Sequence, residues 1–182
     1  MFTNSLFFYN GASRALFCLL AAIIGQPLSA QFVIEQSTTF VTRGAHIVVD
    51  DLDFFNASSL DGTASTFHFT GNKNTTLFGG GTNGFTHLQI NKGAGKEVKL
   101  LSPIFVTTDL AFISGNLELN GNEIALATGA NLVGESETSR ITGVNGGEVR
   151  TQAVLSSPNG ANIGNLGAVV TSTQNLGNVV IR

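Results

Sequence analysis

The chain has 182 residues, enough for one domain with a hydrophobic core, and its formal net charge is −3. Nine Lys and Arg residues against twelve Asp and Glu exclude the surplus of cations by which proteins bind nucleic acids or anionic membranes. The single cysteine, Cys18, excludes an internal disulfide, and its expected loss with the leader removes thiolate chemistry and cysteine-ligated metals.

Residues 1–30 are predicted to form a cleavable secretory signal peptide. A polar start with one basic side chain, Arg14, precedes the apolar run ALFCLLAAIIG over 15–25. This run is shorter than the roughly 20 apolar residues that cross a bilayer, which argues against the alternative of an uncleaved anchor. The residues QPLSA follow, where proline ends the helix and small side chains lead to a cut after Ala30. We therefore expect export, secreted or to the cell surface, and a mature domain over 31–182.

Short alternating strands are predicted for that domain, with almost no helix and no membrane span. Apolar residues recur in pairs separated by one residue, which is the period of a half-buried strand. Asn-Gly dipeptides between them mark turns, because glycine adopts a positive φ at little cost. The pairs are Phe67-x-Phe69, Leu88-x-Ile90, Val98-x-Leu100, Leu110-x-Phe112, Leu117-x-Leu119 and Ile124-x-Leu126.

Apolar residues also return at a longer interval, which distinguishes a solenoid from a β-sandwich. Three interleaved series return after about 21 residues, and a sandwich has no reason to keep such a constant interval. We expect a three-sided all-β solenoid of about seven coils of about 20–22 residues, whose inward side chains stack about 4.8 Å apart. The series are Ile47, Phe67, Leu88, Leu110, Leu132, Val154, Leu176; then Leu77, Val98, Leu119, Ile141, Ile163; and, more loosely, Val106, Leu126, Val149, Val170.

The region 85–182 resembles secreted proteins of Bacteroidota. The resemblance is carried by GNLELNGNEIAL at 115–126, by FTHLQINKGAGKEVKLLSPIFVTTDLAFISG before it, and by ATGANLVGESETSRITGVNGGEVRT and LGAVVTSTQNLGNVVIR after it. It implies a right-handed parallel β-helix in a large extracellular or cell-surface protein that usually ends in a type IX secretion sorting domain. The matching residues are structural Leu, Asn and Gly, so it implies no catalytic residue.

The end of the chain departs from that family. The sequence stops just after the strand-like residues 179–181, with no cap and no sorting domain. Natural solenoids cover the exposed end of their core, so we expect the chain to be the N-terminal fragment of a longer protein.

One dense carboxylate cluster, Asp50-Asp51-Leu52-Asp53, is the candidate for chemistry. Oxygen-only clusters suit calcium, and paired carboxylates can act as acid and base on a polysaccharide. Asp51 and Asp53 share one face of a strand, and Lys73 lies about one coil further on, where a basic partner is expected. The alternative, which we favour, is a solvated turn.

Two further features, the histidines and a glycine run, could indicate a metal site and a phosphate site, but both are better interpreted as structural. His46 and His87 share a register two coils apart, too far for one zinc ion, and His68 is displaced along its strand, so we expect all three to face outward. The run 79–81 is Gly-Gly-Gly without a following Lys and helix, which predicts a flexible loop and not a phosphate site.

These patterns favour a non-catalytic extracellular or cell-surface solenoid that acts as a stalk, spacer or adhesion-type module, with no cofactor and no metal. A glycan or another cell-surface protein would be the partner of an adhesive module. The alternative is a polysaccharide-active β-helix, a lyase or hydrolase, that uses Asp50, Asp51 and Asp53 or calcium bound by Asp51 and Asp53.

Overall fold

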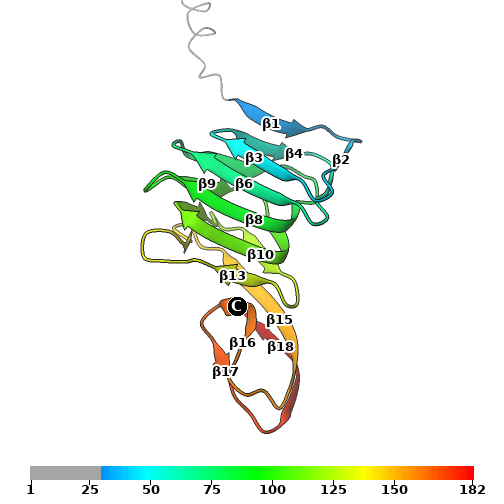
Figure 1. The fold of residues 1–182 in the computed structure, drawn as a ribbon, viewed down its shortest axis with the longest axis vertical. Coiled ribbons are helices and arrows are strands. Elements are labelled where there is room, and N and C mark those ends of the chain that lie inside the picture. The colour runs from blue at the N-terminus through cyan, green and yellow to red at the C-terminus, as the bar shows by residue number, and fades with distance from the viewer. Residues whose placement is uncertain (1–29) are drawn as a thin grey trace, which may run out of the picture.

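The computed structural model describes residues 30–182, which form a stack of coils extended by a narrow ribbon at the C-terminal end (Figure 1). The predicted signal peptide lies outside the described residues except for Ala30. Among residues 30–182, no helix is long and apolar enough to cross a membrane. The predicted all-β solenoid is confirmed, and its coils turn in a right-handed sense (Figure 1).

Two long sheets make up the sides of the stack. The six-stranded sheet contains β1 (Gln31–Ile34), β4 (Asp53–Asn56), β7 (Thr75–Phe78), β9 (Glu97–Leu100), β11 (Asn116–Glu118) and β14 (Ile141–Thr142), in that order. The eight-stranded sheet contains β3 (His46–Asp50), β6 (Thr66–Gly71), β8 (Gly84–Lys92), β10 (Ile104–Ser114), β12 (Glu123–Leu126), β15 (Glu148–Ser156) and β18 (Asn175–Ile181), with β13 (Asn131–Val133) paired to β10.

Shorter elements complete the corners and the C-terminal end. They are the parallel pair β2 (Thr39–Val41) and β5 (Ser59–Asp61), the antiparallel pair β16 (Ala161–Asn162) and β17 (Val169–Val170), and the 3₁₀ turn η1 (Ile163–Asn165). Because each coil gives one strand to the six-stranded sheet, the stack holds six coils, one fewer than the seven that the sequence predicts.

The inward ladder of the eight-stranded sheet is confirmed from Ile47 to Leu132. Strand pairing places Ile47 beside Phe67, Phe67 beside Leu88, Leu88 beside Leu110, and Leu110 beside Leu132. Both members of each predicted apolar pair, from Phe67-x-Phe69 to Ile124-x-Leu126, are buried in one continuous core. Alternation therefore identifies the inward side chains correctly in these six pairs.

The second series is wrong in register. Leu77 pairs with Leu100, while Val98 pairs with Thr75 and with Leu117. One coil thus spans 23 residues, from 77 to 100, and the next spans 19, from 98 to 117. Inward positions recur every second residue, so a strand shifted by two residues still places an apolar side chain in the core. A search for one fixed interval therefore cannot detect such a shift in register.

The last steps of the first and third series are also wrong. Val154 pairs antiparallel with Asn178 and is 75% exposed, so no coil carries Leu132 on to Val154 or to Leu176. Val106 does pair with Leu126, but Val149 pairs with Ile124 and Val170 pairs antiparallel with Ala161. An antiparallel ribbon has the same period of two as a coil strand, so the pattern could not show that the chain turns back.

The C-terminal segment packs against the last coil. Ile163 of η1 is buried, and Leu166 packs against the core. The side-chain amide of Asn165 donates to the carbonyl oxygen of Leu132 at 2.7 Å, which satisfies an acceptor on the free edge of β13. Figure 1 shows this segment directly beyond β13, between the coils and the tip of the ribbon.

The corner after β7 is built from close backbone packing. The glycines at 79 and 81 lie against the preceding coil: an added Cβ at Gly79 would overlap the carbonyl of Asn56, and one at Gly81 that of Ser58. The N–H of Gly81 also donates to the Asn56 carbonyl at 2.9 Å. The predicted flexible loop is therefore a packed corner at two of its three residues, with open space only around Gly80.

We predict that Gly81→Ala destabilises the protein by about 1–3 kcal/mol, because its methyl group would force two coils apart. Gly80→Ala is the matched control and should change stability by less than about 0.5 kcal/mol, because nothing lies near that site. Urea denaturation followed by circular dichroism measures both. Equal stabilities for the two variants would show that the corner is loose in solution.

Candidate functional site

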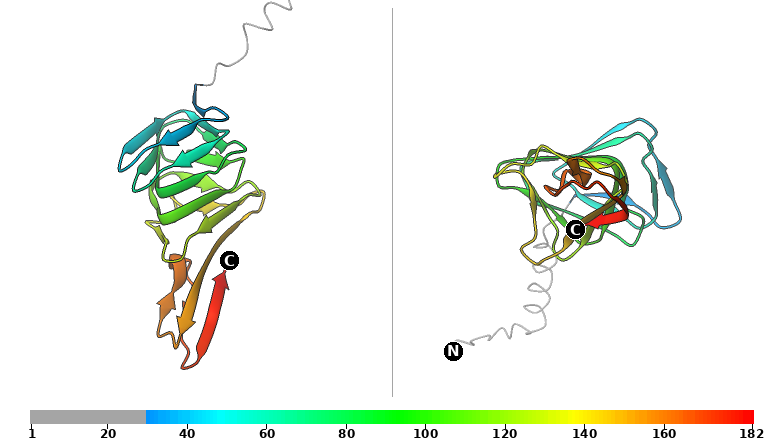
Figure 2. Two further views of the ribbon diagram at one scale, coloured as in Figure 1. Left: turned by 90° about the vertical axis from the view of Figure 1, so that its right-hand side faces the viewer. Right: turned by 90° about the horizontal axis from the view of Figure 1, so that it is seen from below.

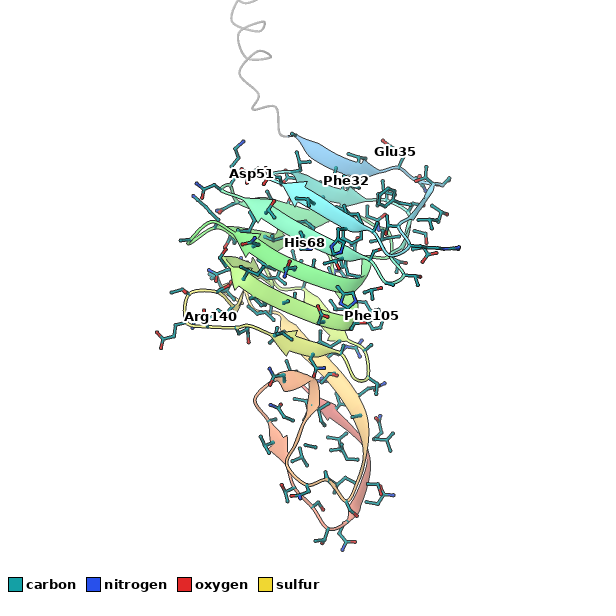
Figure 3. All side chains as sticks on the ribbon, viewed as in Figure 1. Phe32, Glu35, Asp51, His68, Phe105 and Arg140 are labelled. Atoms are coloured by element: carbon teal, nitrogen blue, oxygen red, sulfur yellow. The ribbon has the colours of Figure 1, made fainter. Side chains whose placement is uncertain are left out.

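The acidic cluster lies at the corner where the eight-stranded sheet turns into the six-stranded sheet. Asp50 ends β3, Asp53 begins β4, and Asp51 between them has a positive φ of 52°. That bend turns Asp51 out of the strand path, so it does not share a strand face with Asp53. Figure 3 labels Asp51 at this corner, near the N-terminal end of the stack.

Asp51 bonds to the two following coils. It accepts a hydrogen bond from the backbone N–H of Lys73 at 2.8 Å and one from the ammonium group of Lys92 at 3.1 Å. The side chain of Lys92 is fully buried, and its ammonium group also donates to the carbonyl of Thr70. The basic partner of Asp51 is therefore Lys92 and not Lys73, which the sequence predicts. Lys73 contributes only its backbone N–H.

These donors make Asp51 a stronger acid in the folded protein than an ordinary aspartate. Backbone N–H groups of Asn72 and Lys73, with the ammonium group of Lys92, lower the pKa of Asp51 from 3.8 to about 2. A carboxyl group whose pKa is lower in the folded than in the unfolded protein stabilises the fold at any pH above the unfolded-state pKa. That stabilisation is lost as the pH falls towards the folded-state pKa. Asp51 thus holds the corner closed at neutral pH.

We predict an acid-dependent stability difference between the native protein and Asp51→Asn. The variant should be less stable at neutral pH, because it leaves the buried Lys92 ammonium without its counter-charge. The difference should shrink as the pH falls from 3.8 to about 2, where Asp51 itself becomes neutral. Urea midpoints across this range provide the measurement, and two parallel curves would contradict the assigned role.

The three carboxylates of the cluster do not converge on a common point. The Asp50 carboxylate accepts from the hydroxyl of Thr70 at 2.7 Å, and that of Asp53 from the backbone N–H of Thr76 at 2.7 Å. Each acid therefore bonds to a different residue of the next coil. Among residues 30–182, no group of three His, Asp or Glu side chains is placed to hold a metal ion.

The three histidines lie on the outward face of the eight-stranded sheet. Pairing places His46 and His87 on opposite sides of Thr66, the register that the sequence predicts. The rings of His46 and His68 are 5.7 Å apart, centre to centre. Burial, with the nearby ring of His46, lowers the pKa of His68, whose Nε2 has no hydrogen-bond partner within the described chain.

His87 has a partner that sequence reasoning missed. Its Nδ1 lies 2.5 Å from a carboxylate oxygen of Asp109, the residue opposite it on β10. The 22-residue separation of the two equals one step of the predicted ladder, so the pairing could have been read from the sequence. The pair stands beside a shallow groove of about 580 Å³ between β5 and the starts of β8 and β10.

An imidazole oriented by a carboxylate is an arrangement that a general base uses, but it needs a reacting partner. Two of the four hydroxyls in this groove donate to backbone carbonyls: that of Thr86 to Gly62 at 2.8 Å, and that of Thr107 to Phe85 at 3.4 Å. Asp61 accepts from the hydroxyl of Thr63 at 2.6 Å. The groove thus offers polar contacts to a ligand, without an assembled catalytic set.

Two buried polar groups that sequence reasoning also missed join coils in the same way. The side chain of Asn56 donates to Asn83, which in turn donates to Ser102, so one polar ladder crosses three coils. Glu118 accepts from the hydroxyl of Thr142 at 2.6 Å. Burial alone would raise the pKa of Glu118, but this bond and backbone N–H donors lower it below its usual value.

Comparison with known proteins adds no assignment. The sequence matches no protein-family model, no curated protein and no solved structure.

Proposed function

We propose that the protein is a non-catalytic extracellular or cell-surface β-solenoid that acts as a stalk, spacer or adhesion-type module. The observation that carries this proposal is the use of its polar groups. Asp51 with Lys92, Asn56 with Asn83, and Glu118 with Thr142 each join one coil to another. Buried and partly buried polar side chains therefore hold the stack together.

The architecture suits a rigid spacer. Backbone hydrogen bonds between parallel strands run along the stack, and each coil extends it by about 4.8 Å. The strands of each coil pair with those of its neighbours, so length and stiffness follow from repetition rather than from a compact centre. Such a body separates whatever is attached at its two ends and presents its outward faces to the surroundings.

The extracellular location in this proposal rests on the signal peptide predicted over residues 1–30. It also rests on the resemblance of residues 85–182 to Bacteroidota surface proteins that use type IX secretion. We predict that mass spectrometry of the exported product will show an N-terminus at Gln31. Intact Met1 on membrane-bound material would refute this.

The functional proposal is tested against the polysaccharide-active alternative by calcium titration and by incubation with acidic and neutral polysaccharides. We expect no calcium-dependent change in melting temperature and no new chain ends in any polysaccharide. A calcium-induced rise that is absent from an Asp51→Ala, Asp53→Ala double variant would overturn the proposal, as would depolymerisation. The comparison uses the shift within each protein, because removing Asp51 alone lowers the starting stability.

A further inference from the structure

Phe105 is an exposed aromatic residue on an outward face of the stack. It belongs to β10, and 42% of its surface is exposed. Figure 3 labels it at the side of the stack where β10 begins. Figure 2 (left) faces this side, where strands of successive coils lie one above another and the ribbon of β15 and β18 leaves below them. Among residues 30–182 no second aromatic ring packs on Phe105, whereas the outward ring of Phe55 lies 5.0 Å from that of Phe78.

The strands beside Phe105 leave its ring uncovered. Pairing places Gly84 of β8 on one side of Phe105 and Ala125 of β12 on the other. An added Cβ at Gly84 would meet only a methyl group of Thr82, at 4.0 Å, so the space over this glycine is open. Glycine inside a strand gives up side-chain packing, and it often marks a place where a ligand approaches the backbone closely. Apolar area that larger cross-strand neighbours would cover is thus available to a ligand.

The open ring lies between two shallow hollows of about 340 and 330 Å³, which share Phe105, Ala125 and Arg150. The smaller hollow is lined only by residues between 81 and 150, so the coils themselves build it. Beside the ring, Nε of Arg150 donates to a carboxylate oxygen of Glu123 at 2.5 Å, and both side chains are partly exposed. The guanidinium group has further N–H donors and the carboxylate has a second oxygen with which a ligand can bond.

This combination suits a neutral saccharide. A sugar ring has an apolar C–H face that can lie on an aromatic ring, and its hydroxyl groups both accept from a guanidinium and donate to a carboxylate. Glu148 of β15 lies opposite Glu123 of β12, so two carboxylates stand beside the one guanidinium of Arg150. This balance of charge repels the carboxylate of an acidic sugar, and a neutral sugar has no such cost.

We propose that the groove at Phe105 binds a neutral saccharide, with one sugar ring stacked on Phe105 and its hydroxyl groups bonded to Arg150 and Glu123. The proposal rests on the proposed function, because it gives the adhesion-type module a ligand class and a binding face. The row of paired residues from Gly84 through Phe105 and Ala125 to Arg150 runs along the stack, so the face is continuous across neighbouring coils.

Electrophoresis of the full chain through native gels that contain a polysaccharide tests the proposal. The neutral probes are galactomannan, xyloglucan and laminarin, and polygalacturonate is the acidic comparison. We expect at least one neutral probe to retard the native chain and polygalacturonate not to do so. Phe105→Ala should weaken binding about tenfold or more, the loss of one aromatic contact, whereas Phe105→Trp should bind at least as tightly because its flat face is larger.

Gly84→Val separates binding from folding, because it covers the ring without removing it. The valine side chain would pack on Phe105 as a cross-strand neighbour, so binding should fall as in Phe105→Ala while the melting temperature does not. Phe55→Ala is the control, since it removes an outward aromatic ring from another face, and it should bind as the native chain does.

Three results would overturn the proposal: no retardation by any neutral probe, retardation by polygalacturonate alone, or binding that Phe105→Ala and Gly84→Val leave unchanged. Each of them leaves the stalk or spacer role intact. Shortened polysaccharide chains would instead overturn that non-catalytic role and not the binding site, so the two failures are distinguishable.

Discussion

Replacing Phe54 by alanine is expected to lower the free energy of unfolding by about 3–5 kcal/mol, the range for a large aromatic side chain removed from a packed core. Phe54 is fully buried on β4, in the six-stranded sheet. Its ring stacks on that of Phe32 at 5.4 Å, and it meets the rings of Phe67 and Phe69 edge-on, both at 5.9 Å. The contacts with Phe67 and Phe69 cross the core to the eight-stranded sheet, so the cavity would lie between the two sheets.

Phe55→Ala is the matched control for that substitution. Phe55 is the next residue of β4, points out of the core and is half-buried, with its ring 5.0 Å from that of Phe78. We expect a loss of about 0.5–1.5 kcal/mol, because only an outward aromatic contact disappears. Chemical denaturation of both variants gives the comparison, and a loss at Phe55 equal to that at Phe54 would place the core on the wrong side of the strand.

Leu110→Ala is expected to cost about 2–5 kcal/mol, because Leu110 is a central rung of the inward ladder. It is fully buried between Leu88 and Leu132, one coil away on either side. Truncation would leave a cavity that the neighbouring coils cannot fill without breaking their register. Such a loss is a large fraction of the total stability of a domain of this size.

Val154→Ala distinguishes the observed fold from a continued ladder. The regular 22-residue interval places Val154 inside the stack, whereas the structure exposes it on the ribbon opposite Asn178. We therefore expect its truncation to change stability by less than about 0.5 kcal/mol, as for an ordinary surface position. A loss comparable to that of Leu110→Ala would mean that Val154 is a rung of the ladder after all.

The sequence predicts the coil stack well because alternation and stacking are local and repetitive. An inward side chain such as Leu110 must be apolar whatever the corner beside it does, so the ladder from Ile47 to Leu132 is visible from spacing alone. Corners set how many residues each coil contains, and they do so through backbone packing like that of Gly81 on Ser58. No apolar pattern records such contacts, which is why the second series is displaced.

The polar contacts depend on that register and were harder to predict. The sequence predicts Lys73 as the partner of Asp51 because Lys73 lies one coil away. The observed partner, Lys92, lies two coils away, and its buried side chain reaches back across the coil between them. His87 and Asp109 obey the 22-residue step and were predictable. The reversal of the chain into β18 leaves no sign in the hydrophobic pattern, because a strand alternates in the same way in either direction.

The most direct test of the fold is a set of nuclear Overhauser contacts among labelled methyl groups and backbone protons. The structure predicts methyl contacts of Leu110 with both Leu88 and Leu132, and contacts across the antiparallel pairs that join Val154 to Asn178 and Gln152 to Val180. Contacts between Leu132 and Val154, with none between β15 and β18, would contradict it and restore a seventh coil.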